Sequence, residues 1–249
     1  MKKYCLILML LISSLFMSGQ ALAEKKVLLS SINLPPYTGE QLPEHGFFSQ
    51  IVTRAFAEAG YKVEYQYRPW RRALQEAKTG SVDGVMTAYW EKSSAEYLEY
   101  PDVVWKVTVV VAVLPNQLIT YSGKVSDFRG YTIGVVSGSV VSKHLTSEGI
   151  TTQDVLDHTQ NILKLAAGRI DAMIIPDAVL RYKLSLLATE GKKIEARRLD
   201  TPYKVYDMYV AFSKANPEYK TLTQDFNRGI QLLKSKGEFD RIVADAGLK

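Results

Sequence analysis

Short apolar runs and helically spaced apolar residues alternate along the first part of the chain. Residues 27–32 form an apolar run typical of a strand, and residues 47–59 carry apolar positions on one helical face. Residues 63–67 alternate between apolar and polar positions, which predicts a second strand. This order of strand, helix and strand predicts parallel strands joined by right-handed crossovers.

The stretch that follows is the one around which we expect a binding site. Its apolar residues from Trp70 to Ala77 recur at helical spacing, and Gly80 is a suitable residue to end the helix. A short apolar run over 82–86 then predicts a buried strand. Because ligands of open α/β sheets bind beyond the carboxyl ends of strands, we expect a site between Thr87 and Lys92.

The second half of the chain repeats this alternation after a long β-branched strand. The predicted strands cover residues 105–114, 131–136, 169–175, 194–196 and 206–212, and the predicted helices cover 140–148, 159–168, 178–189, 217–236 and the segment after Gly237. The sequence G-R-I-D-A-M-I at 168–174 resembles G-S-V-D-G-V-M at 80–86. We therefore expect two similar α/β halves.

The N-terminus has the pattern of a cleaved secretory signal. Lys2 and Lys3 precede an apolar segment, and Ala21-Leu22-Ala23 provides a cleavage site, so we expect residues 1–23 to be removed. The apolar segment is too short for a membrane span. Cys5, the only cysteine, lies within it, so the mature chain has no thiol. Without a lipid-anchor pattern, the expected compartment is the periplasm.

Composition narrows the function further. The formal net charge is only +5 over 249 residues, and no dense basic run occurs, so we expect no nucleic-acid partner. His45, His144 and His158 have no metal-ligand spacing, and we expect each on the surface. We predict no metal, no cofactor and a monomer.

The motifs together resemble a known family. T-G-S-V-D-G-V-M-T at 79–87, Tyr100-Pro101-Asp102, S-D-F-R-G at 126–130 and G-R-I-D-A at 168–172 are similar to motifs of the family 3 periplasmic solute-binding proteins. The resemblance implies a two-lobed type II α/β fold, with a parallel-rich sheet in each lobe and helices on both faces. It implies lobe 1 at 24–113 and 205–249, and lobe 2 at 114–204.

The resemblance also implies an anion-binding end of the site. The family holds a carboxylate with an arginine five residues after the threonine equivalent to Thr87, and this chain has Lys92 there. It also uses a loop equivalent to Ser137-Gly138-Ser139, which opens a helix. A helix N-terminus favours an anion, although Ser139 can equally serve as an ordinary N-cap.

The opposite end and the walls of the site differ from the family pattern. Pro176 stands where the family has the aspartate that holds an ammonium group, and Asp177 is one residue late. The resemblance suggests Tyr37 and Trp70 as aromatic walls. Tyr89 is a large ring where the family has a small residue, so it would either contact a flat or apolar part of the ligand or make the pocket smaller. Tyr37 and Trp70 can instead be packing residues, and for Arg72 a solvated position is favoured over the cleft.

These observations predict a periplasmic protein that captures a small amino-acid-like or anionic ligand between two lobes for an ABC importer, without catalysis. Two alternatives stay open. One is an enzyme on the same scaffold, a dehydratase or lyase, with Glu91 or Asp177 as the acid–base group. The other is a ligand sensor that docks to a membrane receptor instead of a permease.

Overall fold

The computed structural model describes residues 25–247. Its first half contains β1 (Lys25–Ser31), the 3₁₀ helix η1 (Pro43–His45), α2 (Phe47–Ala57), β2 (Tyr61–Tyr67), α3 (Trp70–Thr79), β3 (Gly84–Tyr89), α4 (Lys92–Ala95), β4 (Leu98–Glu99) and β5 (Trp105–Val113). The predicted signal peptide, residues 1–23, lies outside the described residues.

The second half begins with the 3₁₀ helix η2 (Val125–Phe128). It continues through β6 (Ile133–Val136), α5 (Val140–Ser147), β7 (Thr152–Val155), α6 (His158–Ala166), β8 (Ala172–Pro176), α7 (Asp177–Thr189), β9 (Arg197–Arg198), β10 (Lys204–Ser213), α8 (Tyr219–Ser235) and α9 (Glu238–Asp245). No helix within 25–247 is long and apolar enough to cross a bilayer.

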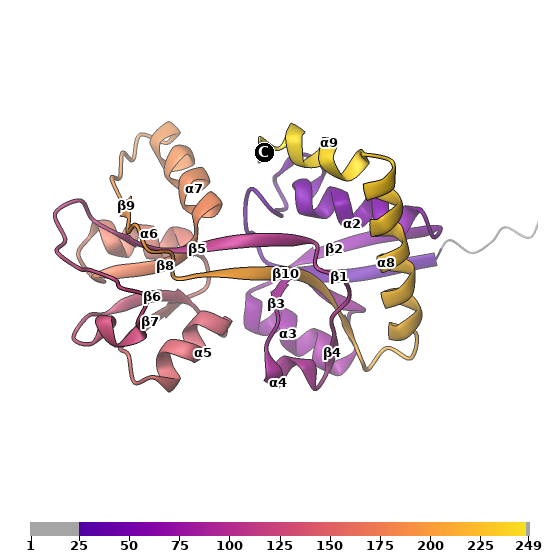
Figure 1. The fold of residues 1–249 in the computed structure, drawn as a ribbon, viewed down its shortest axis with the longest axis horizontal. Coiled ribbons are helices and arrows are strands. Elements are labelled where there is room, and N and C mark those ends of the chain that lie inside the picture. Colours follow the sequence, from indigo (N-terminus) through magenta and orange to yellow (C-terminus); the bar gives the residue numbers. More distant parts are fainter. Residues whose placement is uncertain (1–24, 248–249) are drawn as a thin grey trace, which may run out of the picture.

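These elements form two lobes (Figure 1). Lobe 1 contains β1–β4, α2–α4, α8 and α9, and lobe 2 contains β6–β9 and α5–α7. The long antiparallel strands β5 and β10 run side by side from one lobe to the other. The two-lobed α/β fold predicted from sequence is confirmed, while the residue boundaries of the lobes remain a prediction.

The sheets of the two lobes are joined by hydrogen bonds. The strand order is β2-β1-β3-β10-β5-β8-β6-β7, with β4 on β10 and β9 on β5. Strands β1–β3 pair in parallel, as do β6–β8, whereas β5 and β10 pair antiparallel with their neighbours. A parallel-rich sheet therefore exists in each lobe, but β5 and β10 connect the two into one path.

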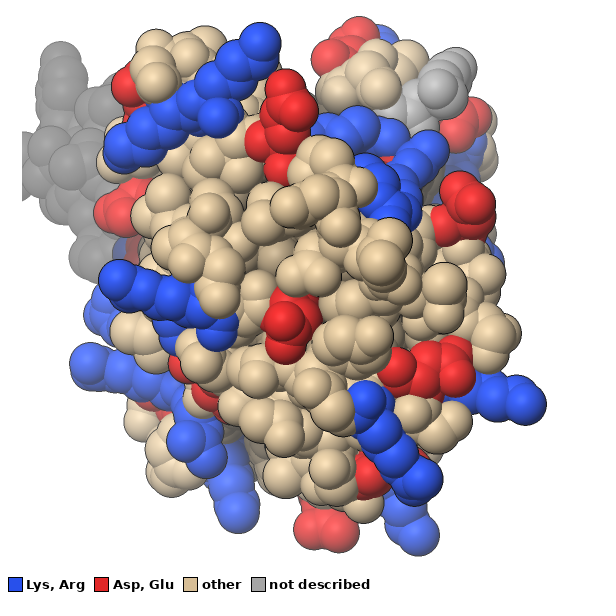
Figure 2. All heavy atoms as spheres, turned by 90° about the vertical axis from the view of Figure 1, so that its left-hand side faces the viewer, with Lys and Arg blue, Asp and Glu red and all other residues tan. Residues whose placement is uncertain are grey.

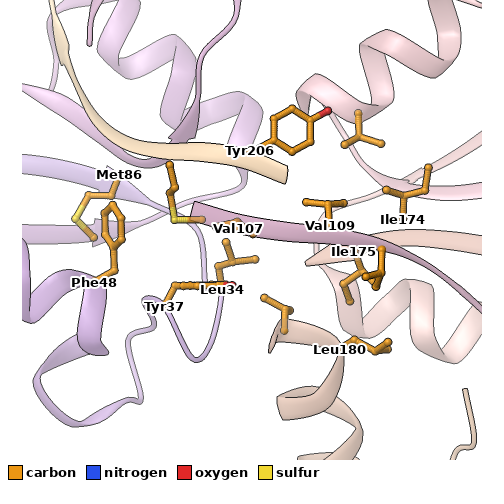
Figure 3. Close-up of a cluster of buried hydrophobic side chains, with 14 of the residues drawn as sticks. Leu34, Tyr37, Phe48, Met86, Val107, Val109, Ile174, Ile175, Leu180 and Tyr206 are labelled. Carbon is orange, nitrogen blue, oxygen red and sulfur yellow. The ribbon is translucent and has the colours of Figure 1, made fainter. Parts of the chain in front are cut away.

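The hydrophobic core is also continuous between the lobes. Figure 3 shows Val107 and Val109 of β5 between lobe 1 side chains such as Leu34 and lobe 2 side chains such as Ile175. In lobe 1, α2 packs closely on α8: the carbonyl oxygen of Ala55 fills the space where a Cβ at Gly229 would lie. Only glycine fits at this crossing.

Some predicted elements need correction. No strand forms at 194–196, where the chain is irregular, and the two-residue strand β9 follows at Arg197. Helix α8 begins at Tyr219, so Pro217 precedes the helix instead of occupying its first turn. Strand β7 was not predicted at all, because its sequence T-Q-D-V offers a single buried apolar residue, Val155.

The end face of lobe 2 mixes both signs of charge. Figure 2 shows this face with basic side chains mostly toward its edges, acidic side chains interspersed among them and uncharged residues over much of its centre. The face has no continuous basic surface of the kind that follows a nucleic-acid backbone.

Candidate functional site

A small cavity lies between the lobes, and we call it the inner cavity. Its volume is about 60 Å³. Lobe 1 contributes Ile32, Leu34, Trp70, Thr87 and Tyr89 to its wall. Lobe 2 contributes Val136, Ser139, Val140, His158 and Pro176. The wall is thus mostly apolar, has a few hydroxyl and ring polar atoms, and includes no carboxylate or basic aliphatic side chain.

A second cavity, the outer cavity, adjoins the first. It measures about 210 Å³ and shares Ile32, Val136 and His158 with the inner cavity. Its other wall residues are more polar: Asn33, Tyr67, Arg68 and Pro69 from lobe 1, and Leu156 and Asp157 from lobe 2. The two cavities together give a site with an apolar end and a charged end.

Both cavities lie at the carboxyl ends of parallel strands. Ile32 follows β1, Arg68 follows β2 and Thr87 lies near the end of β3. In lobe 2, Val136 ends β6 and Pro176 ends β8, whereas His158 comes shortly after β7. Because these strands are parallel within each lobe, their carboxyl ends meet at the edge that faces the other lobe.

Thr87 has an unusual backbone conformation at this edge. Its φ is 57°, which is rare for a β-branched residue. Its hydroxyl Oγ1 donates a 2.7 Å hydrogen bond to the carbonyl oxygen of Met86, and the pairing of β3 with β10 shifts register here, between Tyr209 and Ala211. Such strain costs about 1–3 kcal/mol and is concentrated at functional sites.

Helix N-termini provide the electrostatics of the lobe 2 wall. Ser139 caps α5, and its Oγ accepts a 3.1 Å hydrogen bond from the Ser142 amide. His158 is the first residue of α6, and Pro176 immediately precedes α7. Three helices therefore begin at the inner cavity, and the positive ends of their dipoles favour a negatively charged group there.

The structure brings four of the predicted site residues together. Trp70, Thr87, Tyr89 and Ser139 all line the inner cavity. The ring of Tyr89 also stacks on Tyr206 of β10, with centroids 4.5 Å apart. This placement is compatible with ligand contact for all four, while their binding role stays a prediction.

Ser137 and Gly138 lie beside this group and outside the inner cavity. Ser137 lines a hollow on lobe 2 with Leu156 and Lys164. Gly138 has a φ of 73°, and a Cβ there would lie 2.5 Å from Cγ of Arg71 in lobe 1. The loop thus touches the opposite lobe through its glycine, and Ser139 alone of the three faces the inner cavity.

Tyr37 and Asp177 lie outside both cavities. Tyr37 is 3% exposed and packs on Phe47 with ring centroids 5.5 Å apart. Asp177 begins α7, and its carboxylate lies 2.7 Å from Nη1 of Arg181 and 3.0 Å from Nη1 of Arg198. Two arginines therefore already neutralise the carboxylate that was expected to hold an ammonium group.

The basic candidates of lobe 1 are exposed. Lys92 is the first residue of α4, is solvent-exposed and lines neither cavity. Arg72 is exposed as well, and its Nε donates a 2.9 Å hydrogen bond to Glu76. The neighbouring Glu91 pairs across the lobes with Lys143 of α5, at 2.7 Å. Neither Lys92 nor Arg72 therefore lines the inner or the outer cavity.

The expectation that His158 is a surface residue is wrong. The residue is 8% exposed and sits between the two cavities. Burial and, to a smaller extent, the nearby Lys183 ammonium lower its pKa to about 3, whereas Asp157 opposes the shift. His158 is therefore a neutral imidazole near pH 7. His158 could have been predicted as a site residue because it follows the carboxyl end of β7, but that strand was not predicted from the sequence.

The fold and the cavity define a class, the two-lobed α/β binding proteins. The chain belongs to the bacterial extracellular solute-binding proteins, family 3, whose sequence profile matches residues 28–246. No curated protein matches the sequence.

Solved structures agree with this fold. An amino acid ABC transporter substrate-binding protein from Streptococcus pneumoniae, bound to L-arginine, has a TM-score of 0.73 at 17% identity, covering 89% of this chain and 94% of its own. A histidine kinase sensor domain similar to periplasmic binding proteins has a TM-score of 0.77 at 18% identity, covering 89% of this chain and 96% of its own. An ancestral amino acid-binding protein, a precursor of cyclohexadienyl dehydratase, has a TM-score of 0.70 at 16% identity, covering 88% of this chain and 94% of its own. These similarities show the fold alone.

Proposed function

We propose that this chain is a periplasmic solute-binding protein that encloses a small polar or anionic solute between its lobes and delivers it to an ABC importer. The observation that carries the proposal is the inner cavity, whose wall is shared between the two lobes. A solute held there contacts both lobes at once, so its binding free energy favours the closed form. Family membership and the similarity to transporter binding proteins support the same function.

The wall of the inner cavity favours binding over catalysis. General acid–base chemistry requires a titratable group within hydrogen-bond reach of the substrate. Glu91 and Asp177, the two acids considered from sequence, are engaged in ion pairs and line neither cavity. The imidazole of His158 does line the inner cavity, but its pKa is lowered to about 3, far from the neutral pH at which a general acid or base would have to work. A solute recovered from the protein should therefore remain chemically unchanged during incubation with it.

The first experiment identifies the solute. Protein purified from the periplasm without dialysis is denatured, and the released small molecules are identified by mass spectrometry. Calorimetry with the identified solute should then give one site per chain. A protein that releases no solute and binds none would contradict the proposal.

Matched tryptophan variants test the location. Trp70 lines the inner cavity, whereas Trp90 is 56% exposed and lines neither cavity. Trp70→Ala should weaken binding of the identified solute at least tenfold, because a large apolar contact is lost. Trp90→Ala should change affinity less than twofold. Equal effects in two folded variants would place the site elsewhere.

The importer role has its own test. Cells that lack this protein should lose uptake of the identified solute, and plasmid-borne protein should restore it. Normal uptake together with a lost transcriptional or chemotactic response to the solute would favour the receptor-docking sensor instead.

A further inference from the structure

Two residues that line the outer cavity each have a buried nitrogen with no hydrogen-bond partner among the described residues. One is Nε of Arg68, which comes from the loop between β2 and α3 of lobe 1. The other is Nδ1 of His158, the first residue of α6 in lobe 2. Buried polar atoms are almost always paired, so two orphaned nitrogens in one cavity indicate a missing acceptor.

The neighbours of Arg68 leave its Nε available. Nη1 donates a 3.0 Å hydrogen bond to the carbonyl oxygen of Tyr67, which fixes the side chain. Oε1 of Glu76 lies 3.7 Å from Nε, beyond hydrogen-bond distance. Glu76 instead accepts from Arg72 and Gln66, at 2.9 Å each.

His158 is suited to donate to an acceptor in the same cavity. It is 8% exposed, and its low pKa keeps the imidazole neutral, so the tautomer that carries a proton on Nδ1 has one donor there. Its position at the start of the nine-residue helix α6 adds the positive end of the helix dipole.

The remaining charges around the outer cavity favour an anion. Asp157 is the one carboxylate in its wall, and it caps α6 by accepting from the Thr159 amide. Asp157 also lies 3.7 Å from Nζ of Lys183, which is itself buried. Asp157 is thus balanced by Lys183, and Glu76 is shared between Arg68, at 3.7 Å, and Arg72, at 2.9 Å, so two arginines face one carboxylate and one positive charge remains for a ligand.

We propose that Arg68 and His158 together bind the carboxylate of the ligand, and that the ligand is a small monocarboxylate without an ammonium group. This inference rests on the proposed binding function and deepens it. The carboxylate lies in the outer cavity between Arg68 and His158, and the apolar remainder lies in the inner cavity against Trp70. Because the two nitrogens come from opposite lobes, the carboxylate links the lobes in the closed form.

The absence of an ammonium group follows from the acids nearby. The inner cavity has no carboxylate in its wall. Oδ1 of Asp177 makes no hydrogen bond among the described residues, but Asp177 lines neither cavity and its charge is balanced by the ion pairs with Arg181 and Arg198. An ammonium group buried there without an acceptor would lose its hydration uncompensated. Two adjoining cavities of about 60 and 210 Å³ also restrict the ligand to a small molecule.

Calorimetry with three matched probes tests the ligand class. Isovalerate, L-valine and isovaleramide share a branched apolar part, but L-valine adds an ammonium group and isovaleramide replaces the carboxylate. Wild-type protein should bind isovalerate at least tenfold more tightly than either of the others. Tighter or equal binding of L-valine or isovaleramide overturns the inference.

Variants test the two residues. Arg68→Met and His158→Leu should each weaken isovalerate binding by about 10- to 100-fold, the range for a lost hydrogen bond to a charged group. His158→Asn keeps a donor near the position of Nδ1 and should recover part of the affinity. Arg129→Met, which changes an exposed arginine, is the matched control and should bind as wild type does. Thermal melts establish that each variant is folded.

The outcomes separate this inference from the proposed function. If mass spectrometry recovers an ammonium-bearing or larger solute that closes the lobes while isovalerate does not bind, the proposed function stands and the ligand class is wrong. Unchanged isovalerate binding in folded Arg68→Met and His158→Leu would overturn the assignment of the two residues. If no solute is recovered and none of the probes binds, both the function and the inference fail.

Discussion

The two lobes use the same device to enter a central strand. In lobe 1, Asp83 lies just before β3: its carboxylate accepts a 2.7 Å hydrogen bond from the Leu28 amide, and its own amide donates a 2.9 Å bond to the Leu28 carbonyl. In lobe 2, Asp171 makes the same pair of bonds to Thr132, at 2.7 and 2.9 Å. The shared Gly-x-x-Asp pattern thus has one structural purpose, to fix the strand to its neighbour.

The two strands then end differently. Strand β3 turns through Thr87 with a positive φ and places Thr87 and Tyr89 in the inner cavity. Strand β8 runs straight into α7, whose first residue, Asp177, is paired with two arginines. The comparison teaches that the repeated motif builds the scaffold, whereas the residues after each strand decide which lobe supplies which part of the site.

The largest expected effect on the free energy of unfolding comes from substituting the residues that directly follow Asp83 and Asp171. Gly84 follows Asp83, and a Cβ there would lie 2.5 Å from the Ala211 carbonyl oxygen of β10. Gly84→Ala should destabilise the protein by about 3 kcal/mol, because backbone would have to move. The matched change Ala172→Gly in lobe 2 should cost about 1 kcal/mol. Urea unfolding measures both, and similar losses would show that the two strands are equally crowded.

Acid should reveal the asymmetry of the strand ends. The pKa of His158 is lowered to about 3 in the folded protein, so the unfolded chain binds the proton first as the pH falls. The contribution of neutral His158 to the free energy of unfolding is fully present above about pH 6.5. It falls by about 1.4 kcal/mol per pH unit as the pH decreases toward 3. His158→Asn should flatten the dependence of unfolding free energy on pH between 6.5 and 5. The same slope in wild type and His158→Asn would contradict the buried neutral state.

Removing the paired aspartates tests whether the two devices are equivalent. Asp83 also accepts a 2.7 Å hydrogen bond from Asn216 of the segment before α8, whereas the Asp171 carboxylate has no such additional side-chain donor among the described residues. Asp83→Ala should therefore cost about 2 kcal/mol and Asp171→Ala about 1 kcal/mol. Asn216→Ala should remove most of the difference. A larger loss for Asp171→Ala in urea unfolding would reverse the ranking.

The smallest effect is expected at the ion pair between the lobes. Lys143 and Glu91 lie 2.7 Å apart, with side-chain exposures of 43% and 20%, so water and salt screen their attraction. Lys143→Met should shift the lobes toward the open form by less than about 1 kcal/mol, and salt should reduce the shift. Small-angle scattering at low and high salt measures it. Lys92→Met, a neighbouring exposed lysine, should change neither closure nor solute affinity.

Sequence patterns located most elements because their burial follows simple periodicity. The helix over Trp70–Thr79 and the strands around Val85 and Ile174 all bury a regular face or run. Strand β7 escaped prediction because it lies at the sheet edge beside β6 and alternates weakly. That omission also hid His158, whose place depends on the end of β7.

What the sequence alone determined is the α/β order, the two similar halves and the family membership, since these depend on periodicity and on local motifs such as Gly80 to Asp83. What only the tertiary structure decided is which polar side chains face the space between the lobes. Lys92 and Asp177 have suitable chemistry, but Lys92 is exposed to solvent, and Asp177 is bound by Arg181 of its own helix and by Arg198, which is distant in sequence. Arg68 and His158 lie 90 positions apart and share a cavity through the packing of one lobe on the other.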